Sequence, residues 1–167
     1  MTIHTEHPFV PPEPERDALR RFRGRLAAPV TVVAAGEGRR RAGLTVSSLL
    51  VADGEPPHIV LLVDPDSDLR DAIEVDSPVA ISLLDDGDQF LADAFAGTAP
   101  APGGPFTLGS WTETPWGPVH DGRSSIGARV VSISTLGYSD QIVASVEHIA
   151  IEGTTALSHV RGRYRPV

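Results

Sequence analysis

The order of apolar and polar residues along the chain predicts mostly β-strands, and the stretch Ala42–Val51 has an unusually polar side. As a strand, it points Leu44 and Val46 to one face and Thr45 and Ser47 to the other. The serine that follows interrupts the alternation and places two hydroxyls side by side. This pattern fits a sheet that packs one face inward and offers the other to a polar ligand, and it also fits an ordinary half-exposed strand.

Further segments have the length and apolar content of strands. Residues 29–35 are apolar almost throughout, which predicts a strand buried on both faces. The glycines of residues 36–38 turn the chain back into the first stretch as a hairpin. The remaining strands are expected over residues 58–63, 79–84, 127–134, 140–151 and 157–164. This many strands with few short helices predicts a mainly β fold, a closed or split barrel, rather than a doubly wound parallel sheet.

Two short helices are predicted before the middle of the chain. One covers Glu15–Leu26 and aligns Leu19, Phe22 and Leu26 on one face. The other covers residues 69–73 and begins after a serine and an aspartate that can cap it. The free N–H groups and the dipole at such a helix start favour an anion, although a capped helix without a ligand explains the same residues.

A third helix is predicted over residues 88–96, with an apolar face made of Phe90, Leu91, Ala94 and Phe95. The glycine- and proline-rich residues 97–125 follow and include both tryptophans. They are predicted to form a long irregular loop, which in a compact domain usually has a function or covers something.

Composition narrows the class of protein. The 167 residues suit one domain, expected over residues 15–167 after a loose arm of residues 1–14. The formal net charge of −8 argues against nucleic-acid binding, which needs a basic face. No apolar run is long enough for a membrane helix and no signal peptide is recognisable, so a cytoplasmic protein is predicted.

Several kinds of chemistry are disfavoured by the residue types present. The chain has no cysteine, which excludes disulfides, thiol catalysis and cysteine-bound zinc. The 6 histidines show no spacing typical of a metal site, so no metal is predicted. The sequence has neither a glycine-rich nucleotide motif after a strand nor a serine-hydrolase motif.

Several short motifs occur together in a specific order between about Leu19 and Tyr164: PVTVV (29–33), GLTVSS (43–48), Pro56-Pro57, SDLRDAI (67–73), Phe95-Ala96, GPVHDG (117–122) and RGRY (161–164). In this order and spacing the chain resembles the flavin reductase-like family, the FMN-binding split barrels. The resemblance implies a split β-barrel with a few short helices. It also implies a homodimer that binds FMN (or FAD), takes hydride from NAD(P)H and often supplies reduced flavin to a partner monooxygenase.

The resemblance also implies a set of cofactor-binding residues, and no acid–base pair is required because the cofactor carries the chemistry. The residues expected along the isoalloxazine ring and ribityl chain are Thr45, Val46, Ser47 and Ser48, those near the phosphate are Asp66, Ser67 and Leu69, and those bordering the ring are Phe95 and Ala96. His159 is a candidate contact for the nicotinamide or the flavin, and alternatively a packing residue.

Two places depart from what the family usually has. The turn expected to hold the phosphate contains Asp64, Asp66 and Asp68, and each like charge at ~4 Å costs about 1 kcal/mol in water. An arginine is therefore expected to compensate, the candidates being Arg161, Arg163 and residues 39–41. In addition, Gln141 stands where the family commonly has a histidine associated with the nicotinamide site.

Three functions remain in view. The first is an NAD(P)H-dependent flavin reductase. The second is a non-catalytic protein that binds FMN or another planar ligand on the same fold. The third, ranked last, is an oxidase similar to pyridoxamine-phosphate oxidase relatives. A homodimer is also expected because the strands at residues 58–63 and 79–84 have almost no polar face and the helices are too few to cover them.

Overall fold

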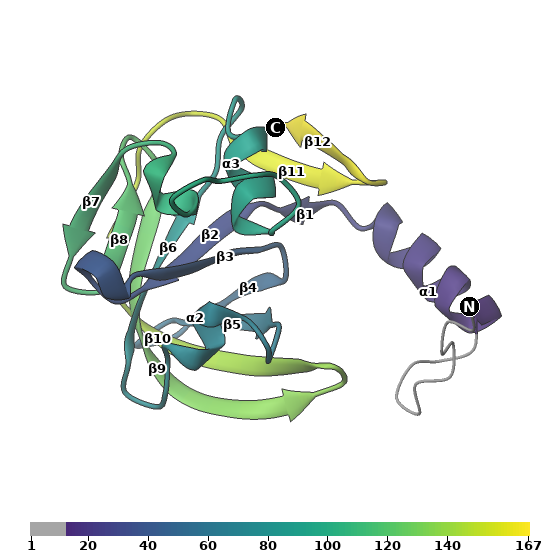
Figure 1. The fold of residues 1–167 in the computed structure, drawn as a ribbon. Helices are drawn as coiled ribbons and strands as arrows, with labels where there is room; N and C mark the ends of the chain where they lie inside the picture. The colour runs from purple at the N-terminus through teal and green to yellow at the C-terminus, as the bar shows by residue number, and fades with distance from the viewer. Residues whose placement is uncertain (1–12) are drawn as a thin grey trace.

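The computed structural model describes residues 13–167, and most of its strand residues lie in one curled antiparallel sheet (Figure 1). The order of its seven strands is β3-β2-β6-β9-β10-β5-β4. Their bounds are β2 Thr31–Ala35, β3 Ala42–Val46, β4 Leu49–Ala52, β5 His58–Val63, β6 Pro78–Leu83, β9 Ser125–Leu136 and β10 Ser139–Ala150. The predicted mainly β, split-barrel fold is confirmed.

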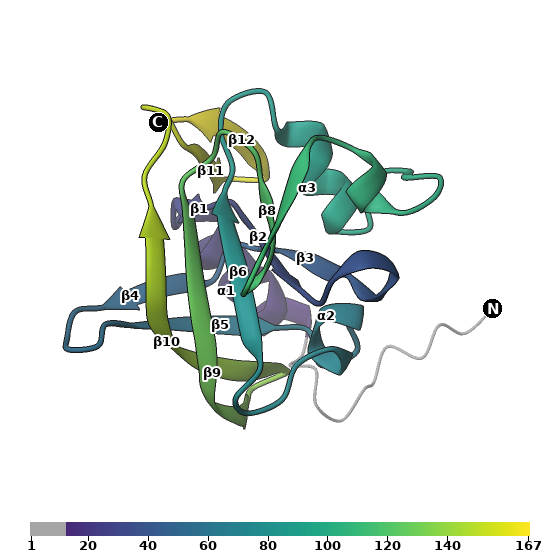
Figure 2. The ribbon, with the colours of Figure 1, turned by 90° about the vertical axis from the view of Figure 1, so that its left-hand side faces the viewer.

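The sheet curls because its two edge strands are consecutive in the chain. Among residues 13–167, β3 pairs only with β2 and β4 only with β5, yet only Ser47 and Ser48 separate β3 from β4. Two residues span at most about 7 Å, so the opposite edges of the sheet must meet at this junction. The result is a half-open barrel, whose strands β10, β9 and β6 lie side by side in Figure 2.

The core has two parts, one inside the curled sheet and one outside it. Val33, Val46 and Leu61 belong to the inner cluster, and Val32 and Phe95 to the outer one. All five residues of β2 are buried, as predicted for a strand covered on both faces. β2 therefore separates the two clusters, and alternate side chains supply each of them.

The remaining elements surround the barrel. They are α1 (Glu13–Arg25), α2 (Asp68–Asp71), α3 (Gln89–Phe95), the 3₁₀ turns η1 (Gly38–Arg40) and η2 (Pro105–Thr107), a sheet of β1 (Ala28–Pro29), β11 (Leu157–Val160) and β12 (Arg163–Pro166), and the hairpin of β7 (Trp111–Thr114) and β8 (Gly117–His120). None of the helices in this part of the chain is both long and apolar enough to cross a membrane.

The expectation that residues 97–125 form an irregular loop was wrong, because they contain the β7–β8 hairpin. β8 lies against β6 and β2: the His120 amide donates to the Ser82 hydroxyl at 2.9 Å, and a Cβ added to Gly117 would lie 3.1 Å from the Ala34 carbonyl oxygen. Gly117 also has φ +132°, which favours glycine. Proline and glycine in residues 115–118 obscure any strand pattern in this segment.

The structure also corrects two expectations about apolar surfaces. Residues 79–82 are all buried within one chain, so the strand at 79–84 leaves no face for a second subunit. The side chains of β5 alternate between buried and half-buried, with Val60 and Leu62 half-buried on its outer face.

On α3, Leu91, Ala94 and Phe95 are buried as predicted, but Phe90 is 54 % exposed because it lies at the start of the helix on the solvent side.

An ion pair fastens α3 to the loop before β9. Arg123 donates from Nε and Nη2 to the two carboxylate oxygens of Asp88, at 2.6 and 2.9 Å, and Asp88 also accepts the Asp85 amide. Burial by itself would raise the pKa of Asp88, but the Arg123 hydrogen bonds, the Asp85 amide and the Arg123 charge outweigh it and hold the pKa below its ordinary value.

We expect Asp88→Asn to lower the free energy of unfolding by about 2 kcal/mol at pH 7, because it leaves Arg123 without its charged partner. The ionised Asp88 contributes stability above its unfolded-state pKa of about 3.9, and this contribution is lost as pH falls through the lower folded-state pKa. Urea denaturation from pH 7 to pH 2.5 should therefore show the difference from wild type shrinking below about pH 4. The exposed Asp71→Asn variant is the control, and a difference that is constant with pH would contradict the assignment.

Candidate functional site

The hydroxyls singled out in the sequence lie where β3 ends and β4 begins. The Thr45 hydroxyl donates to the Ala92 carbonyl of α3 at 2.6 Å. The Ser48 hydroxyl donates to the Leu62 carbonyl at 2.8 Å and accepts the Leu62 amide at 3.2 Å, so it replaces a rung of the β4–β5 ladder. Ser47 makes no side-chain hydrogen bond with any residue that the structure describes. Of the three hydroxyls, that of Ser47 is the one left for a ligand.

Val46 contributes through its backbone rather than its side chain. As predicted from the alternation, Val46 and Leu44 face the inner core while Thr45 faces α3. Val46 is 3 % exposed, and its carbonyl accepts the Thr31 hydroxyl at 2.6 Å. Because β3 has a sheet partner on one side only and both α2 and α3 contact it, its outer edge lies between the two helices.

The acidic turn leads from β5 into α2 and is shaped by its own hydrogen bonds. The Ser67 hydroxyl donates to the Asp64 carbonyl at 2.7 Å and accepts the Arg70 amide at 3.2 Å, which confirms Ser67 as the cap of α2. The Asp66 amide donates to the Asp64 carboxylate at 2.9 Å. Leu69 is fully buried and anchors α2 in the inner core, so its side chain is structural.

Arg70 is the cation beside the acidic turn, and the sequence analysis missed it. Its Nε donates to the Asp140 carboxylate at 2.6 Å and its Nη1 to the Ile73 carbonyl at 2.9 Å. Asp140 lies on β10 and pairs with Val63, the last residue of β5 before the turn. The ion pair of Arg70 and Asp140 therefore joins α2 to β10 beside the acidic turn. Its position three residues after Ser67, in a helix entered from an acidic turn, was the available signal.

The arginines predicted to compensate the turn lie elsewhere. Arg161 and Arg163 are at the turn between β11 and β12, where the Arg161 amide donates to the Gly24 carbonyl in the last turn of α1. Figure 1 places this hairpin at the top of the molecule and α2 in its lower half. Arg41 lies 3.8 Å from the Glu113 carboxylate and 4.8 Å from the centre of the Phe106 ring. Among the described residues, Asp64, Asp66 and Asp68 form no ion pair with any of these arginines.

An aromatic cluster supports β3 from behind. Phe95 is 4 % exposed, and its ring contacts those of Phe106 and Trp111 edge-on, at 4.9 and 5.3 Å between centroids. A Cβ added to Gly43 would lie 2.7 Å from the Phe95 ring, so β3 needs a glycine there. Phe95 therefore positions the strand, while the next residue, Ala96, is exposed at the end of α3.

The C-terminal hairpin holds α3 from its other side. The Tyr164 hydroxyl donates to the Asp93 carboxylate at 2.6 Å, and burial together with the Asp93 charge strongly raises the pKa of Tyr164. His159 lies edge-on to the Tyr164 ring at 5.2 Å between centroids. His159 is therefore connected to the site indirectly, because its neighbour Tyr164 is hydrogen-bonded to Asp93 of α3. Gln141 pairs with Leu62, the residue held by Ser48, and so lies across β5 from the β3–β4 junction.

The fold thus brings together three of the predicted groups and separates a fourth. The stretch Thr45–Ser48, the turn with Asp66 and Ser67, and the end of α3 surround one edge of β3. Arg161 and Arg163 lie apart from this cluster. Within residues 13–167, no three histidine, aspartate or glutamate side chains gather as metal ligands would.

Comparison with known proteins places this architecture in a family. Residues 23–167 match the model of the family described as "Flavin reductase like domain", and the chain belongs to that family. It is 27 % identical over 163 residues to the FMN reductase (NADH) RutF of Variovorax paradoxus, covering 96 % of this chain and 88 % of that protein.

Solved structures share the fold at lower identity. Nitrilotriacetate monooxygenase component B from Mycobacterium thermoresistibile superposes with a TM-score of 0.81 at 20 % identity, over 92 % of this chain and 87 % of that one. BorF, the flavin reductase component of a bacterial two-component tryptophan halogenase, gives 0.80 at 21 % identity, over 91 % and 98 % of the two chains.

The two neighbouring serines are expected to respond differently to truncation. Ser48→Ala removes both bonds to the Leu62 main chain at the closure of the barrel and should lower the free energy of unfolding by about 1–2 kcal/mol. Ser47→Ala should change stability by less than about 0.5 kcal/mol. Denaturant midpoints of the two variants check this, and equal midpoints would show that the Ser48 bonds do not matter for the fold.

Proposed function

We propose that this protein is an NAD(P)H-dependent flavin reductase that binds FMN, with FAD as the other candidate, along the outer edge of β3. The observation that carries the proposal is the β3–β4 junction, where the free Ser47 hydroxyl and an unpaired strand edge lie between α2 and α3. Hydroxyls and backbone amides can hold the flavin carbonyls and ring nitrogens without any charged side chain. The family membership and the names of relatives support the same activity.

In this proposal each part of the site has a separate task. A bound flavin would supply the hydride chemistry, accepting a hydride from a nicotinamide. Ser47 and the backbone of Thr45 and Val46 would orient the ring, with Ala96 at its border. The start of α2, capped by Ser67 and anchored by Leu69, would lie at the phosphate end beside Asp66. Phe95 would keep β3 in place from behind. His159 would contact the nicotinamide or the flavin.

The electrostatics of the turn decide how tightly the phosphate end can be held. Arg70 is the cation found at this turn, and Asp140 already engages it at 2.6 Å. Three further carboxylates in residues 64–68 would repel a phosphate. We therefore expect moderate affinity, as suits a reductase that releases reduced flavin. The same charges favour the alternative, a protein that binds FMN or another planar ligand without turnover.

The test is NAD(P)H oxidation with and without added FMN. A reductase should show oxidation that rises and saturates with FMN, and Ser47→Ala should raise the FMN concentration for half-saturation about threefold to tenfold by loss of one hydrogen bond. Ser132→Ala, an exposed serine of β9, is the control. If FMN raises the melting temperature but no nicotinamide is oxidised, the binding-only alternative holds; if neither occurs, both are wrong.

We further propose that a monooxygenase takes the reduced flavin, that the reaction runs in the cytoplasm, and that the protein is a homodimer. BorF is the reductase component of a two-component system, and this similarity supports a separate partner enzyme. The dimer is supported by α1, whose Leu19 and Phe22 are 54 and 61 % exposed, and by Leu26 directly after it, which is 55 % exposed. A helix of 13 residues is marginal by itself, so another surface must cover its apolar side.

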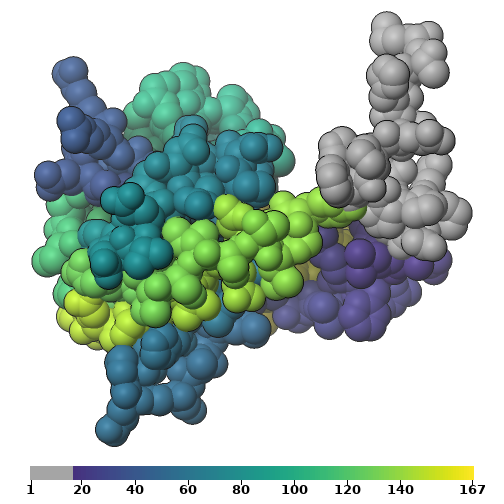
Figure 3. Space-filling model, turned by 90° about the horizontal axis from the view of Figure 1, so that it is seen from below, coloured from purple at the N-terminus to yellow at the C-terminus, as the bar shows by residue number. Residues whose placement is uncertain are grey.

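A second uncovered apolar row crosses the outer face of the barrel. Leu50, Val60 and Val143 are cross-strand neighbours on β4, β5 and β10, and Leu50 is 70 % exposed. Figure 3 shows the β4–β5 hairpin projecting from the body and α1 at its edge. A second copy could cover both surfaces with one isologous interface.

Phe22→Glu is expected to convert the protein to monomers, because it places a charge at the centre of the α1 apolar stripe. Light scattering at micromolar concentration measures the mass, with Arg20→Glu on the polar side of α1 as the charge control. A wild-type mass of one chain, or a dimer that survives Phe22→Glu unchanged, would contradict the proposed surface.

A further inference from the structure

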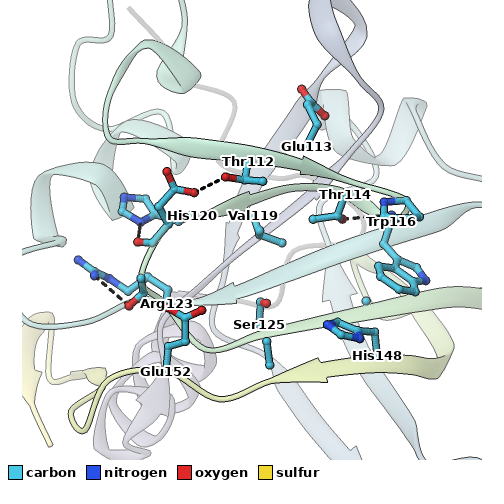
Figure 4. A pocket seen from close by; sticks show the side chains of 15 residues that line it. Thr112, Glu113, Thr114, Trp116, Val119, His120, Arg123, Ser125, His148 and Glu152 are labelled. Carbon is cyan, nitrogen blue, oxygen red and sulfur yellow. Dashed lines mark hydrogen bonds between the residues drawn. The ribbon is translucent and has the colours of Figure 1, made fainter.

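A groove of about 420 Å³ lies on the other side of the barrel from the β3–β4 junction, between the β7–β8 hairpin and the ends of β9 and β10. Figure 4 shows Trp116 and His148 at one end, Glu152 and Arg123 at the other, and Val119 and Ser125 between them. The motif GPVHDG (117–122) contributes residues to this groove, but the proposed flavin site does not use it.

The apolar end of the groove is built rigidly. A Cβ added to Gly127 would lie 2.3 Å from the Trp116 ring, so the indole rests on the bare backbone of β9. The His148 ring stacks on the indole at 5.0 Å between centroids and 9° between planes. The Trp116 amide donates to the Thr114 hydroxyl, and that hydroxyl donates to the Gly117 carbonyl. The hairpin therefore presents the indole in a fixed position before any ligand arrives.

The charged end of the groove carries an unbalanced negative charge. Arg123 is already engaged by both oxygens of Asp88 and, from Nη1, by the Gly122 carbonyl. In the part of the chain that the structure describes, no hydrogen bond or ion pair engages the carboxylate of Glu152. The Glu152 backbone is nevertheless fixed, because its amide and carbonyl both bond to the Ser124 hydroxyl.

We propose that this groove binds a small aromatic amine, with its ring against Val119 and the stacked pair of Trp116 and His148, and its ammonium group at Glu152. A planar ring suits the preformed aromatic wall, and a cation suits an unpaired carboxylate opposite it. An anionic ligand such as a nucleotide phosphate is disfavoured, because the arginine here is already neutralised. The site is separate from the proposed flavin site and does not depend on the flavin reductase assignment.

The test uses tyramine as the cationic probe and tyrosol, its neutral counterpart, in calorimetric titrations of the full chain. Tyramine is expected to bind saturably, and both tyrosol and the Glu152→Gln variant are expected to reduce the affinity about tenfold. Glu55→Gln, an exposed glutamate of the β4–β5 hairpin with the same charge change, should bind tyramine as the wild type does. Flavin-stimulated NAD(P)H oxidation, if present, should be unchanged by Glu152→Gln.

Nuclear magnetic resonance provides a second measurement that does not depend on a variant. Tyramine should shift the signals of the Trp116 indole and the His148 ring and leave the Trp111 indole, which donates to the Leu108 carbonyl, unchanged. Absence of saturable binding, equal affinity for tyrosol, full affinity in Glu152→Gln, or shifts confined to the β3–β4 junction would each overturn the proposal.

Discussion

The structure depends on one short connection: Ser47 and Ser48 link the two opposite edges of a seven-stranded sheet. A flat sheet cannot satisfy such a link, so the sheet curls until its edges meet, and the apolar sides of its strands close over one inner core. The Ser48 hydroxyl completes the closure by bonding both main-chain groups of Leu62. The geometry of the candidate site follows from this closure, because it leaves the outer edge of β3 without a strand partner.

The same connection explains why a ligand-binding edge can persist without becoming a pairing edge for other chains. α2 and α3 lie beside β3, and each is fastened from outside: α2 by Arg70 to Asp140, and α3 by Tyr164 to Asp93 and by Asp88 to Arg123. The fastenings are charged or hydrogen-bonded contacts between segments far apart in the sequence. They hold both flanks of the edge in place while the Ser47 hydroxyl stays free.

Features governed by local sequence were predictable, and features governed by long-range packing were not. Alternation in Ala42–Val46, the fully buried β2 and the Ser67 cap each depend on a few neighbouring residues, and the structure confirms them. Arg70 was missed because its role comes from Asp140, seventy residues away. The β7–β8 hairpin was missed because its short strands are interrupted by glycine and proline, and covering β6 requires knowing where β6 lies. The place of Arg161 and Arg163 at the β11–β12 turn was not predictable, because nearness to the acidic turn cannot be deduced from the order of the chain.

The central claim is that the edge of β3 and the start of α2 form one flavin site, and amide hydrogen exchange with and without FMN tests it most directly. We expect FMN to slow exchange in two segments together, residues 44–48 and residues 66–70, because a single ligand would contact both. Slowed exchange at residues 112–120 alone would place the ligand in the groove beside Trp116 instead. Unchanged exchange at the β3–β4 junction with saturating FMN would contradict the account.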